Sequence, residues 1–86
     1  MPNVALNTDK QHRESDREVG WNVFAPDWVR GEARQGLMKR LQQEFVSRCR
    51  QEHVEPHLPV RVYSKRGRED ARDGTWYRMV AIGRKV

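Results

Sequence analysis

The sequence predicts a small α+β domain with the element order β-α-β-β. We expect a three-stranded, mostly antiparallel sheet with one helix packed on one of its faces. Three observations support this prediction: a four-residue repeat of apolar side chains typical of a helix, a preceding β-branched and aromatic run, and two later runs with alternating apolar side chains. A chain of 86 residues has room for one domain, which we place at residues 19–86.

The first strand is predicted to follow a polar arm. Residues 7–18 contain no apolar side chain, so they cannot offset the entropy of ordering, and we expect a disordered arm over 1–18. The strand then covers 19–25 and ends at Pro26. Its side chains on one face are Val19, Trp21, Val23 and Ala25.

A single helix comes next. Asp27 is the expected N-cap, and Pro56 is expected to end the helix near His53, because proline cannot continue it. The apolar stripe that should face the sheet is Ala33, Leu37, Leu41, Phe45 and Cys49, broadened by Met38 and Val46.

Two strands, over 58–64 and 75–82, follow the helix. The ten residues between them, 65–74, are strongly charged and are predicted to form a long mobile loop. A right-handed crossover would set the first two strands parallel, and the third strand is expected to lie between them, antiparallel to both.

Strand periodicity predicts what each face of this hairpin carries. If the apolar side chains share the helix side, residues that pair across the hairpin must have numbers with an odd sum. Val80 and Ile82 then lie on the open face, where we expect the arm, a partner or a second copy to cover them. The expected pairs are Val60 with Met79, Val62 with Tyr77, Arg61 with Arg78, and Tyr63 with Trp76.

Charge indicates the function of that open face. The net charge is +5, and residues 57–86 alone carry eight basic against three acidic side chains. Aromatic rings stack on unpaired bases and arginines contact phosphates, so we expect binding of RNA or, less favoured, single-stranded DNA, or association with a nucleoprotein. Two alternatives are a purely structural Tyr63–Trp76 pair and a protein-contact patch. The residues assigned to nucleic-acid binding are Arg61, Tyr63, Lys65, Arg66, Arg68, Trp76, Arg78, Arg84 and Lys85.

The charged loop over 65–74 has two interpretations. It could order on a nucleic acid as an arginine-rich grip. Its own charge is only +1, however, so a self-neutralising, solvated loop is the simpler interpretation.

A second function class is a non-catalytic interaction or inhibitor protein that docks on an acidic protein surface. Trp28 would anchor such a partner from the sheet edge, although it could instead cover one end of the core. Val80 and Ile82 would complete the contact, and the protein itself would be a monomer or a weak homodimer.

Other functions find no support in the sequence. Cys49, His53 and His57 lie four residues apart, but Pro56 separates the last from the helix, and Cys49 is better explained as a buried core thiol. We therefore expect no metal, no cofactor and no enzymatic activity. One cysteine rules out an internal disulfide, and the absence of a long apolar run predicts a cytoplasmic protein that does not enter a membrane.

Overall fold

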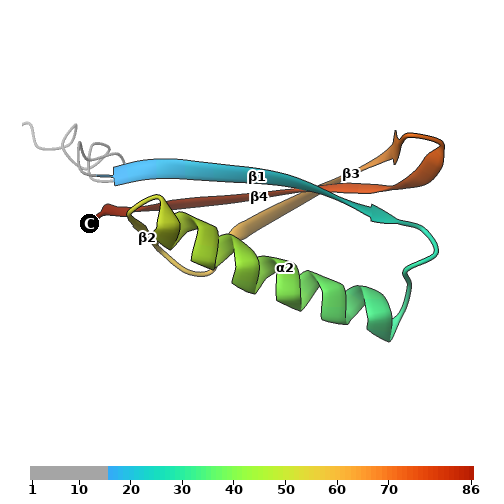
Figure 1. The fold of residues 1–86 in the computed structure, drawn as a ribbon, viewed down its shortest axis with the longest axis horizontal. Helices are drawn as coiled ribbons and strands as arrows, with labels where there is room; N and C mark the ends of the chain where they lie inside the picture. The colour runs from blue at the N-terminus through green and yellow to red at the C-terminus, as the bar shows by residue number, and fades with distance from the viewer. Residues whose placement is uncertain (1–15) are drawn as a thin grey trace, which may run out of the picture.

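The computed structural model describes residues 16–86, which form one helix and an antiparallel sheet (Figure 1). The predicted α+β class and the order β-α-β-β are confirmed, with one extra short strand. Residues 1–15 of the expected arm lie outside the described residues, and the first strand starts earlier than predicted, at Asp16. The elements are β1 (Asp16–Pro26), α2 (Glu32–Gln51), β2 (Val54–Pro56), β3 (Arg61–Glu69) and β4 (Arg72–Lys85).

Strand β4 lies at the centre of the sheet, antiparallel to every neighbour. β1 pairs along one side of it over its whole length. On the other side, β3 pairs with the first part of β4 and the short β2 pairs with its last residues. The predicted central position of the last strand is thus confirmed, and β2 makes the sheet four-stranded rather than three-stranded.

The prediction of a long loop over 65–74 is wrong. β3 and β4 continue through these residues and meet in a turn at Asp70 and Ala71. Asp70 has a φ of 57°, a left-handed conformation that aspartate tolerates. Ion pairs hold the ends of the strands together, since Arg68 Nε lies 2.9 Å from Asp73 Oδ1 and Arg72 Nη2 lies 2.8 Å from Glu69 Oε1.

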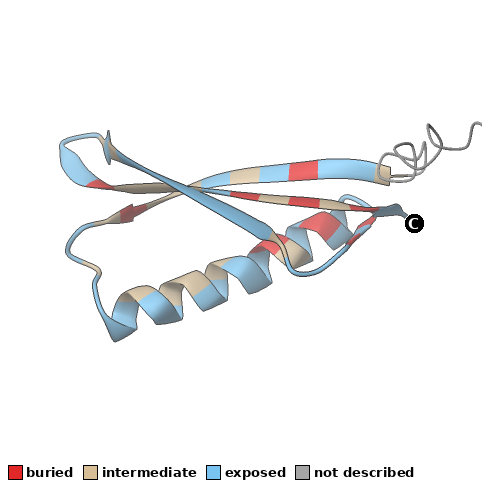
Figure 2. Cartoon of the chain, turned by 180° about the vertical axis from the view of Figure 1, so that it is seen from behind, coloured by how far each residue is buried: buried red, intermediate tan, exposed pale blue. Residues whose placement is uncertain are grey.

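The core lies between the sheet and the C-terminal half of α2. Figure 2 shows most buried positions where this half of the helix faces the sheet. Phe45 and Cys49 of the predicted stripe are fully buried, whereas Leu37 is half-buried and Ala33 is exposed. The core cluster is Val19, Phe45, Cys49, Val54, Met79 and Ala81.

The molecule is elongated for its size. Its radius of gyration is 16.2 Å, against about 12 Å for a compact chain of this length. A thin, elongated shape buries little apolar area per residue, which leaves a small core. The helix is not apolar enough to cross a membrane, and the described part of the chain has no other helix.

The helix begins later than the sequence predicts. Gly31, with a φ of 62°, precedes its first residue, and no side chain caps it. Asp27 is therefore not the N-cap. Its carboxylate accepts two hydrogen bonds from Arg66, at 2.6 and 2.7 Å, and so joins the β1–α2 connection to the hairpin. At the other end, the helix stops at Gln51, close to His53 as predicted.

Arg34 holds the start of the helix against the sheet. Its guanidinium donates hydrogen bonds to the carbonyl oxygens of Val29 and Pro26 and to the hydroxyl of Tyr77, at 2.9, 3.0 and 2.8 Å. These bonds tie the β1–α2 connection to the sheet.

Burial of Cys49 leads to a first prediction. The side chain is fully buried in the core, and burial raises the pKa of the thiol, because a thiolate is poorly solvated there. The thiolate is the reactive form, so the native protein should react with an aromatic disulfide reagent far more slowly than the protein in denaturant. An equal rate in both conditions would contradict the burial.

Candidate nucleic-acid interface

The sheet has one face toward α2 and one open face, here called the outer face. Buried Val19, Met79 and Ala81 lie on the helix side. Alternation along the strands therefore places Arg61, Tyr63, Trp76 and Arg78 together on the other side, as the strand periodicity predicts.

The predicted register within that face is wrong by two residues. Tyr63 lies opposite Arg78 rather than Trp76, and Arg61 lies opposite Val80 rather than Arg78. The tight turn at Asp70 and Ala71 fixes this pairing. A shift of two residues leaves every side chain on its predicted face, because the side-chain period of a strand is also two. It separates the two arginines, so the expected like-charge pair is absent from the described hairpin.

Strand β1 contributes the third column of the outer face. The side chains of the outer face form rows that cross the sheet from β1 through β4 to β3 or β2. In order from the hairpin turn, the rows are Phe24–Trp76–Lys65, Asn22–Arg78–Tyr63, Gly20–Val80–Arg61, Glu18–Ile82 and Asp16–Arg84–Glu55. The aromatic and basic rows adjoin the hairpin turn, and the carboxylates lie at the opposite end. We call these regions the basic–aromatic end and the acidic end.

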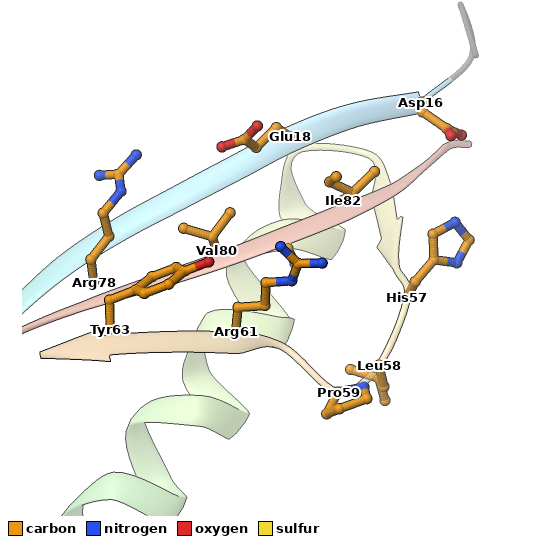
Figure 3. A pocket seen from close by; sticks show the side chains of 11 residues that line it. Asp16, Glu18, His57, Leu58, Pro59, Arg61, Tyr63, Arg78, Val80 and Ile82 are labelled. Carbon is orange, nitrogen blue, oxygen red and sulfur yellow. The ribbon is translucent and has the colours of Figure 1, made fainter. Parts of the chain in front are cut away.

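A groove of about 760 Å³ runs along the outer face. Figure 3 shows Arg78 and Tyr63 at one end of it, Asp16 and His57 at the other, and Val80 and Ile82 between them. The concave surface therefore has an apolar floor with charged ends.

The basic–aromatic end presents an accessible ring with cations around it. Tyr63 is 54% exposed, and Arg61 and Lys65 are also exposed. Within residues 16–86, no carboxylate lies within ion-pair distance of Arg61, Lys65 or Arg78. These cations are free to contact phosphates, and the Tyr63 ring can stack on a base.

Glycine at position 20 lets Arg78 lie flat on the sheet. A Cβ atom at Gly20 would lie 2.9 Å from Arg78 Nη2, so any larger residue would push the guanidinium away. Arg78 Nη1 also donates a 3.2 Å hydrogen bond to Asn22 Oδ1. The two contacts direct the Arg78 guanidinium toward β1.

Trp76 is less accessible than the sequence suggests. Its ring packs against Phe24, with centroids 5.2 Å apart, and its Nε1 donates a 3.3 Å hydrogen bond to the Arg68 carbonyl oxygen. Gly67 leaves room for the ring, because a Cβ there would lie 2.7 Å from Trp76 Cδ1. Trp76 therefore shapes this end of the face and leaves Tyr63 as the open stacking surface.

Four other predicted cations lie elsewhere or are already paired. Arg66 binds Asp27, and Arg68 binds Asp73. Arg84 lies in the same row as Asp16 and Glu55, and Lys85 is on the helix side of the sheet. These ion pairs agree better with a self-neutralising segment over 65–74 than with an arginine-rich grip.

Sequence reasoning missed the residues that β1 contributes, namely Asp16, Glu18, Asn22 and Phe24. The signal was present, because placing Trp21 and Val23 toward the helix sends Asn22 and Phe24 to the other face. What the sequence did not give was the register of β1 against β4, and Asp16 and Glu18 had been assigned to the polar arm rather than to the strand.

The residues proposed for protein contact fall into two places. Val80 and Ile82 form the floor of the groove. Trp28 is 74% exposed in the β1–α2 connection and does not line the groove. The structure therefore does not unite the three in one surface.

The bond between Asp27 and Arg66 gives a second prediction. The hydrogen bonds from Arg66 hold the pKa of the Asp27 carboxyl below its ordinary value. This pair therefore contributes stability above the ordinary aspartate pKa and loses it as the pH falls through the lowered folded-state value. NMR titration of the carboxyl carbons should show that Asp27 becomes protonated at a lower pH than a free aspartate does. In Arg66→Gln its pKa should rise, whereas Arg72→Gln, which leaves Asp27 untouched, should not change it.

Comparison of the chain with protein families, with curated proteins and with solved structures finds no significant match.

Proposed function

We propose that the protein binds single-stranded nucleic acid, RNA in preference to DNA, through the basic–aromatic end of the outer face. One observation carries the proposal: exposed Tyr63 lies on a concave sheet surface between cations that have no carboxylate partner among residues 16–86. Base stacking on an aromatic ring contributes about 1–3 kcal/mol per base, and nearby cations contact the phosphates. The proposed setting is the cytoplasm, and no catalytic step is involved.

The geometry favours unpaired bases over a duplex. A ring that lies on a sheet face can stack only on a base that has left its own stack. The amide group of Asn22 adds polar recognition, because its oxygen already accepts from Arg78 and its nitrogen is left to donate to a base or a ribose hydroxyl. The 2′-hydroxyl is the group that distinguishes RNA from DNA, which supports the preference for RNA.

Titration of a fluorescently labelled single-stranded RNA tests the proposal. Tyr63→Ala should weaken binding at least about fivefold, since a base would lose its stacking partner, and Tyr63→Phe should bind nearly as well as the parent. Arg61→Ala should also weaken binding, while Arg40→Ala, which removes the same charge from the helix surface, should have little effect. Equal losses for Arg61→Ala and Arg40→Ala would show that only net charge matters and would contradict the site.

Salt dependence gives an independent readout of the phosphate contacts. With three contacts, from Arg61, Lys65 and Arg78, the log–log slope of affinity against salt should be about −2 for a single strand. A flat dependence, or no binding at low salt, would refute the proposal.

Protein binding is the second candidate function, favoured by the exposure of Trp28. A large aromatic side chain that is 74% exposed is a common anchor at protein interfaces. The partner would be an acidic protein surface. Trp28→Ala should abolish its capture, and retention of all partners by this variant would exclude the role.

A further inference from the structure

The outer face carries opposite charges at its two ends. Carboxylates Asp16 and Glu18 of β1 lie at one end of the groove, and Arg78 lies at the other. The row of Gly20, Val80 and Arg61 lies between Glu18 and Arg78, so these two are one row to either side of it. Such a face is complementary to a reversed copy of itself.

The floor of the groove is apolar at the centre of this pattern. Val80 and Ile82 are only partly buried, although their neighbours on the helix side, Met79 and Ala81, are part of the core. The chain is elongated, with a radius of gyration of 16.2 Å, and its core is small. Covering further apolar surface would therefore add a comparatively large share to its stability. A partner that matches both the apolar floor and the charged ends would provide this.

We propose that the partner is a second copy of this chain, packed outer face against outer face with its strands running in the reverse direction. A two-fold axis that crosses the strands at the row of Val80 exchanges the two ends of the face. Glu18 of each copy then approaches Arg78 of the other, and the apolar floors of the two grooves face each other across the axis. A two-fold axis along the strands would instead bring Arg78 onto Arg78 and Glu18 onto Glu18, which is unfavourable. The chosen axis sets only Arg61 opposite its own copy, and Arg61 is exposed on β3, which pairs with β4 alone, so its side chain can turn to solvent. The contact is isologous, so the dimer is closed.

The position of Arg78 supports this pairing. Its guanidinium lies over Gly20 and bonds to Asn22, so it is displaced from β4 toward the β1 column. The two-fold axis places the β1 column of one copy over the β1 column of the other. Glu18, which belongs to β1, therefore meets Arg78 rather than a cation on β3.

The dimer would cover the site proposed for nucleic acid. Tyr63 and Arg61 lie in the same groove, so self-association and oligonucleotide binding should exclude each other. This consequence rests on the proposed function, whereas the association itself rests only on the charges and the apolar floor of the outer face.

Charge-reversal variants test the association by sedimentation equilibrium. The full chain should show a concentration-dependent monomer–dimer equilibrium. Glu18→Arg and Arg78→Glu should each weaken association at least about tenfold, because each places two like-charge pairs in the homodimer. A mixture of the two variants should dimerise again, since each copy of one then meets an opposite charge on the other. Glu44→Arg and Arg40→Glu, reversals on the helix surface, should dimerise like the parent.

The outcomes separate this inference from the proposed function. A parent protein that stays monomeric at every soluble concentration, or a mixture that fails to regain the dimer while circular dichroism shows both variants folded, would overturn the inference. Oligonucleotide binding by a monomeric protein would leave the proposed function intact. If the protein both dimerises and binds RNA through this face, Glu18→Arg should bind RNA more tightly than Glu44→Arg, which adds the same charge but leaves the dimer in place.

Discussion

Replacement of Phe45 by alanine is expected to lower the free energy of unfolding by about 3–5 kcal/mol. The ring is fully buried and lies parallel to Trp21, with centroids 6.3 Å apart and 12° between the planes. No second apolar layer can collapse into the space, because the sheet lies on one side and the helix backbone on the other. Since a small domain has roughly 5–15 kcal/mol of stability in total, this one change removes a large part of it.

Thermal unfolding, followed by circular dichroism, measures this loss. The melting temperature should fall by at least about 12 °C, at 4–8 °C per kcal/mol for a domain of this size. Leu37→Ala is the matched control, because Leu37 belongs to the same apolar stripe but is only half-buried. A similar loss for both variants would mean that the helix is packed equally along its length, contrary to the burial described above.

The face of each strand residue could be predicted from the sequence, but its partner could not. Whether Arg61 and Tyr63 point away from the helix depends only on alternation, which survives a register shift of two residues. The partner depends on the turn. At the turn, Asp70 adopts a left-handed conformation, and the ion pair of Arg68 with Asp73 continues the strands into a segment that has no apolar alternation.

The start of the helix was mispredicted for a related reason. Asp27 follows proline and has a capping side chain, so local chemistry favours it as an N-cap. Its actual partner is Arg66, 39 residues further along the chain. Local sequence preference cannot anticipate a contact at that separation.

The candidate site was half predictable. Alternation along the two strands of the hairpin was enough to predict that Tyr63, Arg61 and Arg78 share one face of the sheet. Glu18 and Asp16 were assigned to the polar arm, and they became part of that surface because the pairing of β1 with β4 extends as far as Asp16 and Arg84. The acidic end, which gives the outer face its self-complementary charge pattern, therefore follows from tertiary structure alone.

Replacement of Gly74 by alanine is the second change expected to have a large effect, with a loss of about 3 kcal/mol or more in the free energy of unfolding. Gly74 is buried where β4 passes the end of β1 and pairs with Pro26. An added Cβ would lie 2.5 Å from Phe24 Cζ and 2.9 Å from Pro26 Cα, and closer still to the carbonyl oxygen of Ala25. Two of these contacts are with backbone, which cannot move aside without separating the strands.

Gly36→Ala is the matched control for the same chemical change. Gly36 lies in the helix and has no atom within 4 Å of the added methyl group, so this variant should gain up to about 1 kcal/mol from helix propensity. Urea denaturation of both variants gives the two free energies. Under the proposed function, Gly74→Ala should also weaken RNA binding at temperatures where it is folded, because separation of the strands would displace Phe24 from Trp76 at the basic–aromatic end. Equal stabilities for the two variants would contradict the close packing of β1 on β4 at this end of the sheet.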